Sequence, residues 1–132
     1  MSRLPIHRSS QLSDFGVYLK TVISRTSASS DRYAFSHTDD YYFFGFIEGG
    51  QCRLNIDFEE YVFGKGSLAI ILPGQVHRII DASNLSAKFL VIDSVLVDKE
   101  EKRTLERYGR PQIQLSDISE QKLLLSLLDC KL

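Results

Sequence analysis

Four side chains near the middle of the sequence could build a small-molecule site. His37, Asp39, Tyr41 and Phe43 alternate along the chain, and alternate residues of a β-strand project from the same face. Imidazole and carboxylate groups can anchor a ligand while aromatic rings form the walls, which is the mixture that small-molecule sites use. Core packing explains Tyr41 and Phe43 equally well, and a hydrogen-bonded pair would satisfy His37 and Asp39 without any ligand.

The two cysteines, Cys52 and Cys130, show no sign of catalytic or metal chemistry. Neither stands at metal-binding spacing from the other or from a histidine. Cys52 also has no neighbouring base in the sequence that would activate its thiol as a nucleophile. We interpret both as free thiols of a protein from a reducing cytoplasm.

The segment between Ala34 and Asp93 is typical of an all-β structure. From Gln51 to Ile56 apolar and polar residues alternate with period two, the pattern of a half-buried strand. Short turn sequences at residues 48–50, 57–59, 64–66 and 73–74 separate this strand from others. Six strands at such close spacing predict a β-sandwich or β-barrel. They are expected at Tyr41–Ile47, Gln51–Ile56, Tyr61–Phe63, Ser67–Leu72, Val76–Ile80 and Leu85–Asp93.

The segments that flank these strands are less strongly patterned. Residues 10–23 fit either a short helix or a first strand. Residues 98–108 are charged and helix-favouring, and Gly109-Arg110-Pro111 should end that helix. Residues 112–115 are expected to be short and extended.

A second helix is expected from Ser116, whose side chain can cap it. Its leucines cover more than one face, whereas a helix that packs on one barrel needs a single apolar stripe. We therefore expect a homodimer, with the surplus leucines at its interface, although all of them could pack on the chain's own barrel. The chain ends inside this helix without a cap, which indicates a fragment of a longer protein. The expected interface residues are Leu124, Leu125, Leu127 and Leu128, and the helix also carries Leu123 and Leu132.

The composition excludes several classes of protein. The chain has 132 residues, enough for one domain, with 43% hydrophobic and 25% charged residues, which is ordinary for a globular protein. The formal net charge of -1 argues against a dedicated DNA-binding domain, which usually has a basic excess. No apolar run is close to about 18 residues, the length that a membrane-spanning helix needs. Residues 1–10 do not form a signal peptide.

Two stretches resemble the paired motifs of the cupin family. The first cupin motif is His-x-His, three or four residues, Glu, six residues, Gly. Here the spacing is kept by His37, Asp39, Phe43 and Gly50, but Asp39 replaces the second histidine and Phe43 replaces the glutamate. These two departures fall on the positions that the family uses to hold a metal.

The second cupin motif is Gly, five residues, Pro-x-Gly, two residues, His, three residues, Asn. Here it is matched by Gly66, Leu72-Pro73-Gly74, His77 and Asp81. The two glycines and His77 are kept, whereas Leu72 and Asp81 depart from the pattern.

The order of these segments is similar to the amino-terminal domain of AraC-type transcription regulators. The resemblance is carried by Asp57–Tyr61, Gly64–Ser67 and the Pro-Gly-x-x-His turn at Pro73–His77. It implies a cupin, or jelly-roll, barrel at residues 34–93, preceded by an N-terminal arm at residues 1–33 and followed by a helical dimerisation segment at residues 94–132. It also implies a carboxy-terminal double helix-turn-helix domain for DNA, which lies outside this sequence.

The same resemblance bears on metal binding. In cupins the metal would be held at the positions of His37, Asp39, Phe43 and His77. Histidine and carboxylate are competent ligands for iron, manganese or zinc, and His37, Asp39 and His77 could form a facial triad. Phe43, however, places an apolar ring where a charged ligand should point. We expect no metal and no other cofactor.

Three functions remain open at this stage. The first is an effector-sensing and dimerisation domain of a bacterial regulator, without enzymatic activity. The second is a small metal-dependent cupin enzyme of dioxygenase or isomerase type, and the third is a stand-alone ligand-binding cupin. The expected effector is a small molecule, such as a sugar, held by His37, Asp39, Tyr41, Phe43 and His77. No membrane contact is expected.

Overall fold

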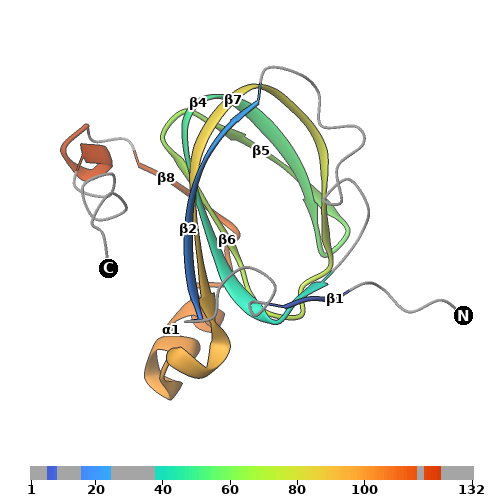
Figure 1. Ribbon diagram of the computed structural model, residues 1–132, viewed down its shortest axis with the longest axis vertical. Coiled ribbons are helices and arrows are strands. Elements are labelled where there is room, and N and C mark those ends of the chain that lie inside the picture. The colour runs from blue at the N-terminus through green and yellow to red at the C-terminus, as the bar shows by residue number, and fades with distance from the viewer. Residues whose placement is uncertain (1–5, 9–15, 25–37, 116–117, 123–132) are drawn as a thin grey trace, which may run out of the picture.

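The computed structural model of the chain describes residues 6–8, 16–24, 38–115 and 118–122. Within these residues one antiparallel sheet bends round on itself into a barrel, with a helix at one end (Figure 1). The predicted all-β core followed by a helix is thus confirmed. The division of the chain into segments at residues 33 and 93 stays a prediction. The sheet includes strands from the segments before residue 34 and after residue 93.

Two long strands form the frame of the barrel. β4 (Tyr41–Ile56) and β7 (His77–Asp93) pair in antiparallel register from Tyr41↔Asp93 to Ile56↔His77. Both curve through the whole height of the barrel (Figure 1). Because each of these two strands curves along opposite sides of the barrel, residues far apart within one strand face each other across the interior.

Shorter strands complete the fold. Their bounds are β1 Ile6–His7, β2 Val17–Ser24, β3 Thr38–Asp39, β5 Glu59–Gly64, β6 Ser67–Ile71 and β8 Gln112–Gln114. The order of the sheet is β2-β7-β4-β6-β8, with β5 paired to β4. β2 pairs with the second half of β7, from Val17↔Ile92 to Ser24↔Leu85. A separate pair, β1 with β3, is parallel.

The turn predicted at Glu48–Gly50 is wrong, because β4 continues through it. The pairing of β4 with β7 shifts register between Ile47 and Gly49 and again between Gly49 and Gln51, as at a β-bulge. Gly50 has φ +74°, and a Cβ atom there would lie 2.2 Å from the carbonyl oxygen of Asn84. Gly50 therefore marks a close approach of two backbones, which the sequence alone does not distinguish from a reversal.

The predicted separation of Val76–Ile80 from Leu85–Asp93 is also wrong. β7 runs through the intervening residues and pairs with β4 at Asp81, Ala82 and Ser83. Asn84 adopts φ 48°, a left-handed conformation that asparagine tolerates better than most residues. A third register shift, between Arg53 and Leu54 of β4, falls in this region without ending the strand.

Outside the frame the element predictions mostly hold. β2 occupies the segment that fitted either a helix or a strand, and the turn at Pro73-Gly74 is present. α1 (Lys99–Tyr108) begins after Asp98, whose side chain accepts a hydrogen bond from the Glu101 N–H at 2.8 Å, and ends at Gly109 with φ 63°. A 3-10 helix, Ser94–Leu96, precedes it.

The second predicted helix is described only in part. Residues 118–122 are helical, whereas Ser116 and the leucines at 123, 124, 125, 127, 128 and 132 lie outside the described residues. No helix in the described part of the chain is long and apolar enough to cross a membrane.

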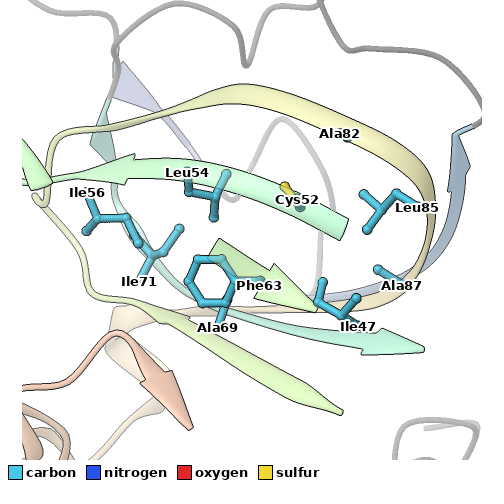
Figure 2. Packing of buried hydrophobic residues seen from close by; sticks show 10 residues of the cluster. All are labelled: Ile47, Cys52, Leu54, Ile56, Phe63, Ala69, Ile71, Ala82, Leu85 and Ala87. Atoms are coloured by element: carbon cyan, nitrogen blue, oxygen red, sulfur yellow. The ribbon is translucent and has the colours of Figure 1, made fainter. Parts of the chain in front are cut away.

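The core lies inside the barrel, where both halves of β4 meet β5, β6 and β7 (Figure 2). Phe63 is completely buried, and Ile56 and Ala69 are almost so. Burying a side chain of the size of Phe63 contributes about 1.5–3 kcal/mol, so this cluster supplies much of the stability that holds the barrel closed. The members shown in Figure 2 are Ile47, Cys52, Leu54, Ile56, Phe63, Ala69, Ile71, Ala82, Leu85 and Ala87.

Candidate functional site

The interior of the barrel encloses a cavity of about 210 Å³ beside the core cluster. Its walls come from β2, β3, β4, β5, β6 and β7, and most of its surface is apolar. The aromatic part of the lining is formed by Tyr18, Tyr41, Phe43, Phe63 and Phe89. A concave, mostly apolar site with a few polar groups is the usual form of a small-molecule site.

The β-bulge at Gly49-Gly50 decides which residues of β4 reach the cavity. Before the bulge the odd-numbered residues, Tyr41 to Ile47, face inward; after it the even-numbered Cys52 and Leu54 do so. A strand without the bulge would keep one parity along its whole length. The bulge therefore places Cys52 and Leu54 at the cavity instead of Gln51 and Arg53.

Four of the five predicted ligand-binding residues come together at this cavity. Asp39, Tyr41, Phe43 and His77 all line it. The sequence pointed to the first three by their period-two spacing and to His77 by the second cupin motif. His37 lies outside the described residues.

Asp39 and His77 form a buried polar pair in the cavity wall. The Nε2 atom of His77 lies 3.2 Å from Oδ2 of Asp39, and the two side chains are 8% and 2% exposed. The Gly74 N–H donates a hydrogen bond to the Asp39 carbonyl at 3.0 Å, which ties the Pro73-Gly74 turn to this residue. The pair thus lies where the turn meets the start of the first motif strand.

A second contact orients the ring of His77. Its Nδ1 atom lies 3.1 Å from the carbonyl oxygen of Gln75, which can only accept a hydrogen bond, so a hydrogen bond here requires a proton on Nδ1. The Nε2 atom then faces the carboxylate of Asp39.

An aromatic pair forms another part of the wall. The rings of Phe43 and Phe89 lie 4.9 Å apart at an angle of 58°, a tilted arrangement that aromatic pairs favour. Gly45 leaves room for them, since a Cβ atom there would lie 3.0 Å from Phe43 and 3.3 Å from Phe89. Phe43, which replaces the metal-binding glutamate of cupins, is therefore part of an apolar wall.

The sequence analysis missed Tyr18, Lys20 and Val22, three alternate residues of β2 that also line the cavity. Their period-two spacing was the signal, but the segment fitted a helix as well as a strand, so the face could not be assigned. Cys52 was likewise not recognised as a lining residue. Burial, and to a smaller extent the charge of Asp81, raises the pKa of its thiol to about 11.

Asp81, at the asparagine position of the second cupin motif, lies away from the cavity. Its carboxylate accepts hydrogen bonds from Nε of Arg53 at 2.9 Å and from Nη2 of the same side chain. Hydrogen bonding to Arg53 lowers the pKa of Asp81. The aspartate that replaces the asparagine of the motif is therefore part of an ion pair with Arg53 on the sheet surface.

The described residues hold no group of three or more His, Cys, Asp and Glu side chains that could bind a metal ion. His37, the third member of the expected triad, is outside that part of the chain. Asp39 and His77 alone do not make a metal site of the usual ligand number.

Comparisons with known proteins agree on a family and a fold. Residues 20–131 match the family described as AraC-like ligand binding domain. No curated protein matches the sequence significantly.

Among solved structures, the barrel resembles an apo form of ToxT from Vibrio cholerae, with 14% identity, a TM-score of 0.61 and coverage of 89% of this chain but 48% of ToxT. It also resembles a Ralstonia eutropha protein named as a mannose-6-phosphate isomerase (16% identity, 63% of this chain, 80% of that chain, TM-score 0.54). A third similar structure is the nucleoside dehydratase Pac13 of Streptomyces (12% identity, 82% of this chain, 77% of that chain, TM-score 0.50). At such identities these likenesses concern the fold alone.

Proposed function

Because this chain belongs to the family of AraC-like ligand binding domains, we propose that it senses a small-molecule effector for a bacterial transcription regulator of the cytoplasm. The family membership confirms the resemblance that the sequence carried, and the barrel is of the cupin type. The sensing role itself is the proposal.

The cavity is the observation that carries this proposal. It lies inside the barrel, is lined mainly by apolar and aromatic side chains, and includes a polar pair at Asp39 and His77. Ligand sites combine these features, since apolar walls supply affinity and a few polar groups fix orientation. Its volume of about 210 Å³ suits a compact molecule.

We propose further that the chain acts as a homodimer and that its DNA contacts belong to a helix-turn-helix domain outside this sequence. The leucines at 124, 125, 127 and 128 would form the dimer contact. Residues 118–122, which precede them in the sequence, are helical. Two-fold symmetry is the commonest arrangement of oligomers and suits regulators that read paired half-sites in DNA.

A ligand screen by thermal unfolding, with the chain and a cavity-filling variant, tests the sensing role. Ala69 lines the cavity and is 2% exposed, so Ala69→Leu should fill part of the cavity with little cost to packing. An effector at about 100 times its Kd should stabilise the parent chain by about 2.7 kcal/mol. The variant should keep its fold, by circular dichroism, and lose this stabilisation.

The same samples separate the sensor from the enzyme, since two of the similar structures are named as enzymes. Elemental analysis should find no stoichiometric iron, zinc or manganese, and a ligand that stabilises the chain should be recovered unchanged after long incubation. One bound metal per chain, or conversion of the ligand that Ala69→Leu abolishes, would contradict the sensor and support the cupin enzyme.

A further inference from the structure

We propose that occupancy of the cavity is transmitted to the helical residues 118–122 through β6, β8 and the side chains of Gln112, Gln114 and Gln121, here called the glutamine clasp. This inference rests on the proposed function, because it states how a bound effector acts on the rest of the chain. The leucines of the proposed dimer contact follow residues 118–122 in the sequence, so the clasp connects the effector to the self-association of the chain.

β6 is shared between the cavity wall and β8. Ala69 and Ile71 line the cavity, are each 2% exposed, and point into the barrel (Figure 2). Along its edge the same strand pairs with β8, in which Gln112 is the register partner of Ala69. The Nε2 atom of Gln112 also donates a hydrogen bond to the Val62 carbonyl at 2.7 Å, which ties β8 to β5. Because protein interiors are close-packed, an occupant that displaces β6 also displaces β8.

The middle of the clasp is a hydrogen bond between side chains of β6 and β8. Ser67 is 1% exposed, and its hydroxyl donates to Oε1 of Gln114 at 2.9 Å. The same hydroxyl oxygen accepts a hydrogen bond from the Gly64 N–H at 3.2 Å, and Nε2 of Gln114 donates to the Lys65 carbonyl at 3.2 Å. Gln114 thus holds the end of β8 to the turn between β5 and β6. Hydrogen bonds of neutral groups each contribute little net free energy, so these contacts can rearrange without unfolding the barrel.

The turn at Gly66 brings the clasp, the cavity wall and the helical residues together. The Gly66 N–H donates a hydrogen bond to the carbonyl of Ile47, a residue of the cavity wall, at 2.8 Å. The Gly66 carbonyl accepts one from the Leu115 N–H at 2.9 Å, and the Leu115 carbonyl accepts one from Nε2 of Gln121 at 2.6 Å. A Cβ atom at Gly66 would lie 2.8 Å from Nε2 of Gln121 and 3.0 Å from Nε2 of Gln114. Two clasp residues therefore meet at a turn that also holds the wall.

α1 is less suited to receive a signal from the cavity. None of its residues is buried, and none of them lines the cavity. The clasp, in contrast, is joined to wall residues twice, through the register of Gln112 with Ala69 and through the hydrogen bond between Gly66 and Ile47. A small displacement inside a packed barrel is passed on by such direct contacts.

NMR spectroscopy with xenon tests this route, because xenon enters apolar cavities. In the parent chain, xenon should shift the methyl signals of Leu54 and Ile71, which line the cavity. We expect it also to shift the backbone amide signals of Leu115 and of residues 119–122, which lie beyond β8.

Two variants cut the route at successive points. Gln114→Ala should keep the xenon-induced shifts of the wall methyls and lose those of Leu115 and of residues 119–122. Gln121→Ala removes only the last contact of the clasp. It should keep the shift at Leu115 and lose the shifts at residues 119–122.

Gln51 provides the matched control. It is an exposed residue of β4, it does not line the cavity, and it belongs to neither β6 nor β8. Gln51→Ala removes the same amide group from a strand outside the clasp and should leave every xenon-induced shift unchanged.

A clasp that only holds β8 in place would give a different result. Wall methyls that shift while Leu115 and residues 119–122 do not, amide shifts that persist in Gln114→Ala, or amide shifts lost in Gln51→Ala would each overturn the route and leave the sensing role standing. If the wall methyls themselves do not shift, xenon does not enter the barrel, and both the route and the cavity on which the proposed function depends are contradicted.

Discussion

Both ring nitrogens of His77 are already committed within the protein. Nδ1 lies 3.1 Å from the Gln75 carbonyl and Nε2 lies 3.2 Å from Asp39. The contact between Nδ1 and a backbone carbonyl fixes the orientation of the ring, and it directs Nε2 at Asp39 in the cavity wall.

Cys52 should be a poorly reactive thiol with a recognisable effect on pH stability. Its pKa is raised from 9.0 to about 11, chiefly by burial, so the neutral thiol is favoured in the folded state. Its contribution to stability is complete below pH 9 and is lost as the pH rises towards 11. Denaturation curves at pH 8 to 11 should show a steeper loss for the parent chain than for Cys52→Ala.

Alkylation gives an independent measurement on the same residue. In a Cys130→Ser background, iodoacetamide at pH 8 should label Cys52 slowly in the folded protein and rapidly in denaturant, because the thiolate is the reactive form. Equal labelling rates in both states, or identical pH profiles of the parent chain and Cys52→Ala, would show that the thiol is not held neutral.

At the level of single residues, the sequence pointed to those cavity-lining residues that belong to a recognisable sequence pattern. Asp39, Tyr41, Phe43 and His77 were found because a period-two face and the Pro-Gly-x-x-His turn point to them. Lys20 carries no such motif, and its place at the cavity depends on the pairing of β2 with β7. A long-range pairing of that kind leaves no local signal in the sequence.

At the level of elements, Gly50 should be the least replaceable glycine of β4. Its φ of +74° disfavours any side chain, and a Cβ atom would lie 2.2 Å from the Asn84 carbonyl oxygen. Gly50→Ala should therefore lower the free energy of unfolding by about 1–3 kcal/mol, measured by urea denaturation.

Gly64 is the matched control for that substitution. It lies on β5, and a Cβ atom there meets no other atom within 4 Å. Gly64→Ala should change the stability by no more than about 0.5 kcal/mol. Equal effects of the two substitutions would mean that the bulge does not constrain β4.

The errors of element prediction share one physical cause. Residues 48–50 and 81–84 contain the small and polar residues that often form turns, and here they bend two paired strands instead. Whether such a segment reverses the chain depends on the strand that pairs with it, which local composition does not specify. Elements with local determinants, such as α1 with its cap at Asp98 and its end at Gly109, were predicted closely.

At the level of the whole molecule, we expect the leucines at 124 and 128 to hold two copies together. Leu124→Asp with Leu128→Asp should convert a dimer into a monomer, because each leucine buried at the contact contributes about 1.5–3 kcal/mol before the cost of association. Sedimentation over a range of concentrations measures this directly. A parent chain that is monomeric at every concentration would contradict the proposed dimer.

The pairing of β2 with β7 also has a consequence for the way the chain is made. Partner residues in this pair lie 61 to 75 positions apart. At about 5–20 residues per second, a ribosome needs roughly 3–15 s to deliver β7 after β2 has been synthesised. Throughout that interval β2 has no β7 to pair with, and the side chains of Tyr18 and Val22, which line the cavity of the folded barrel, are accessible to other nascent chains. Translation speed between codons 24 and 92 should therefore influence how much of this protein reaches its folded state.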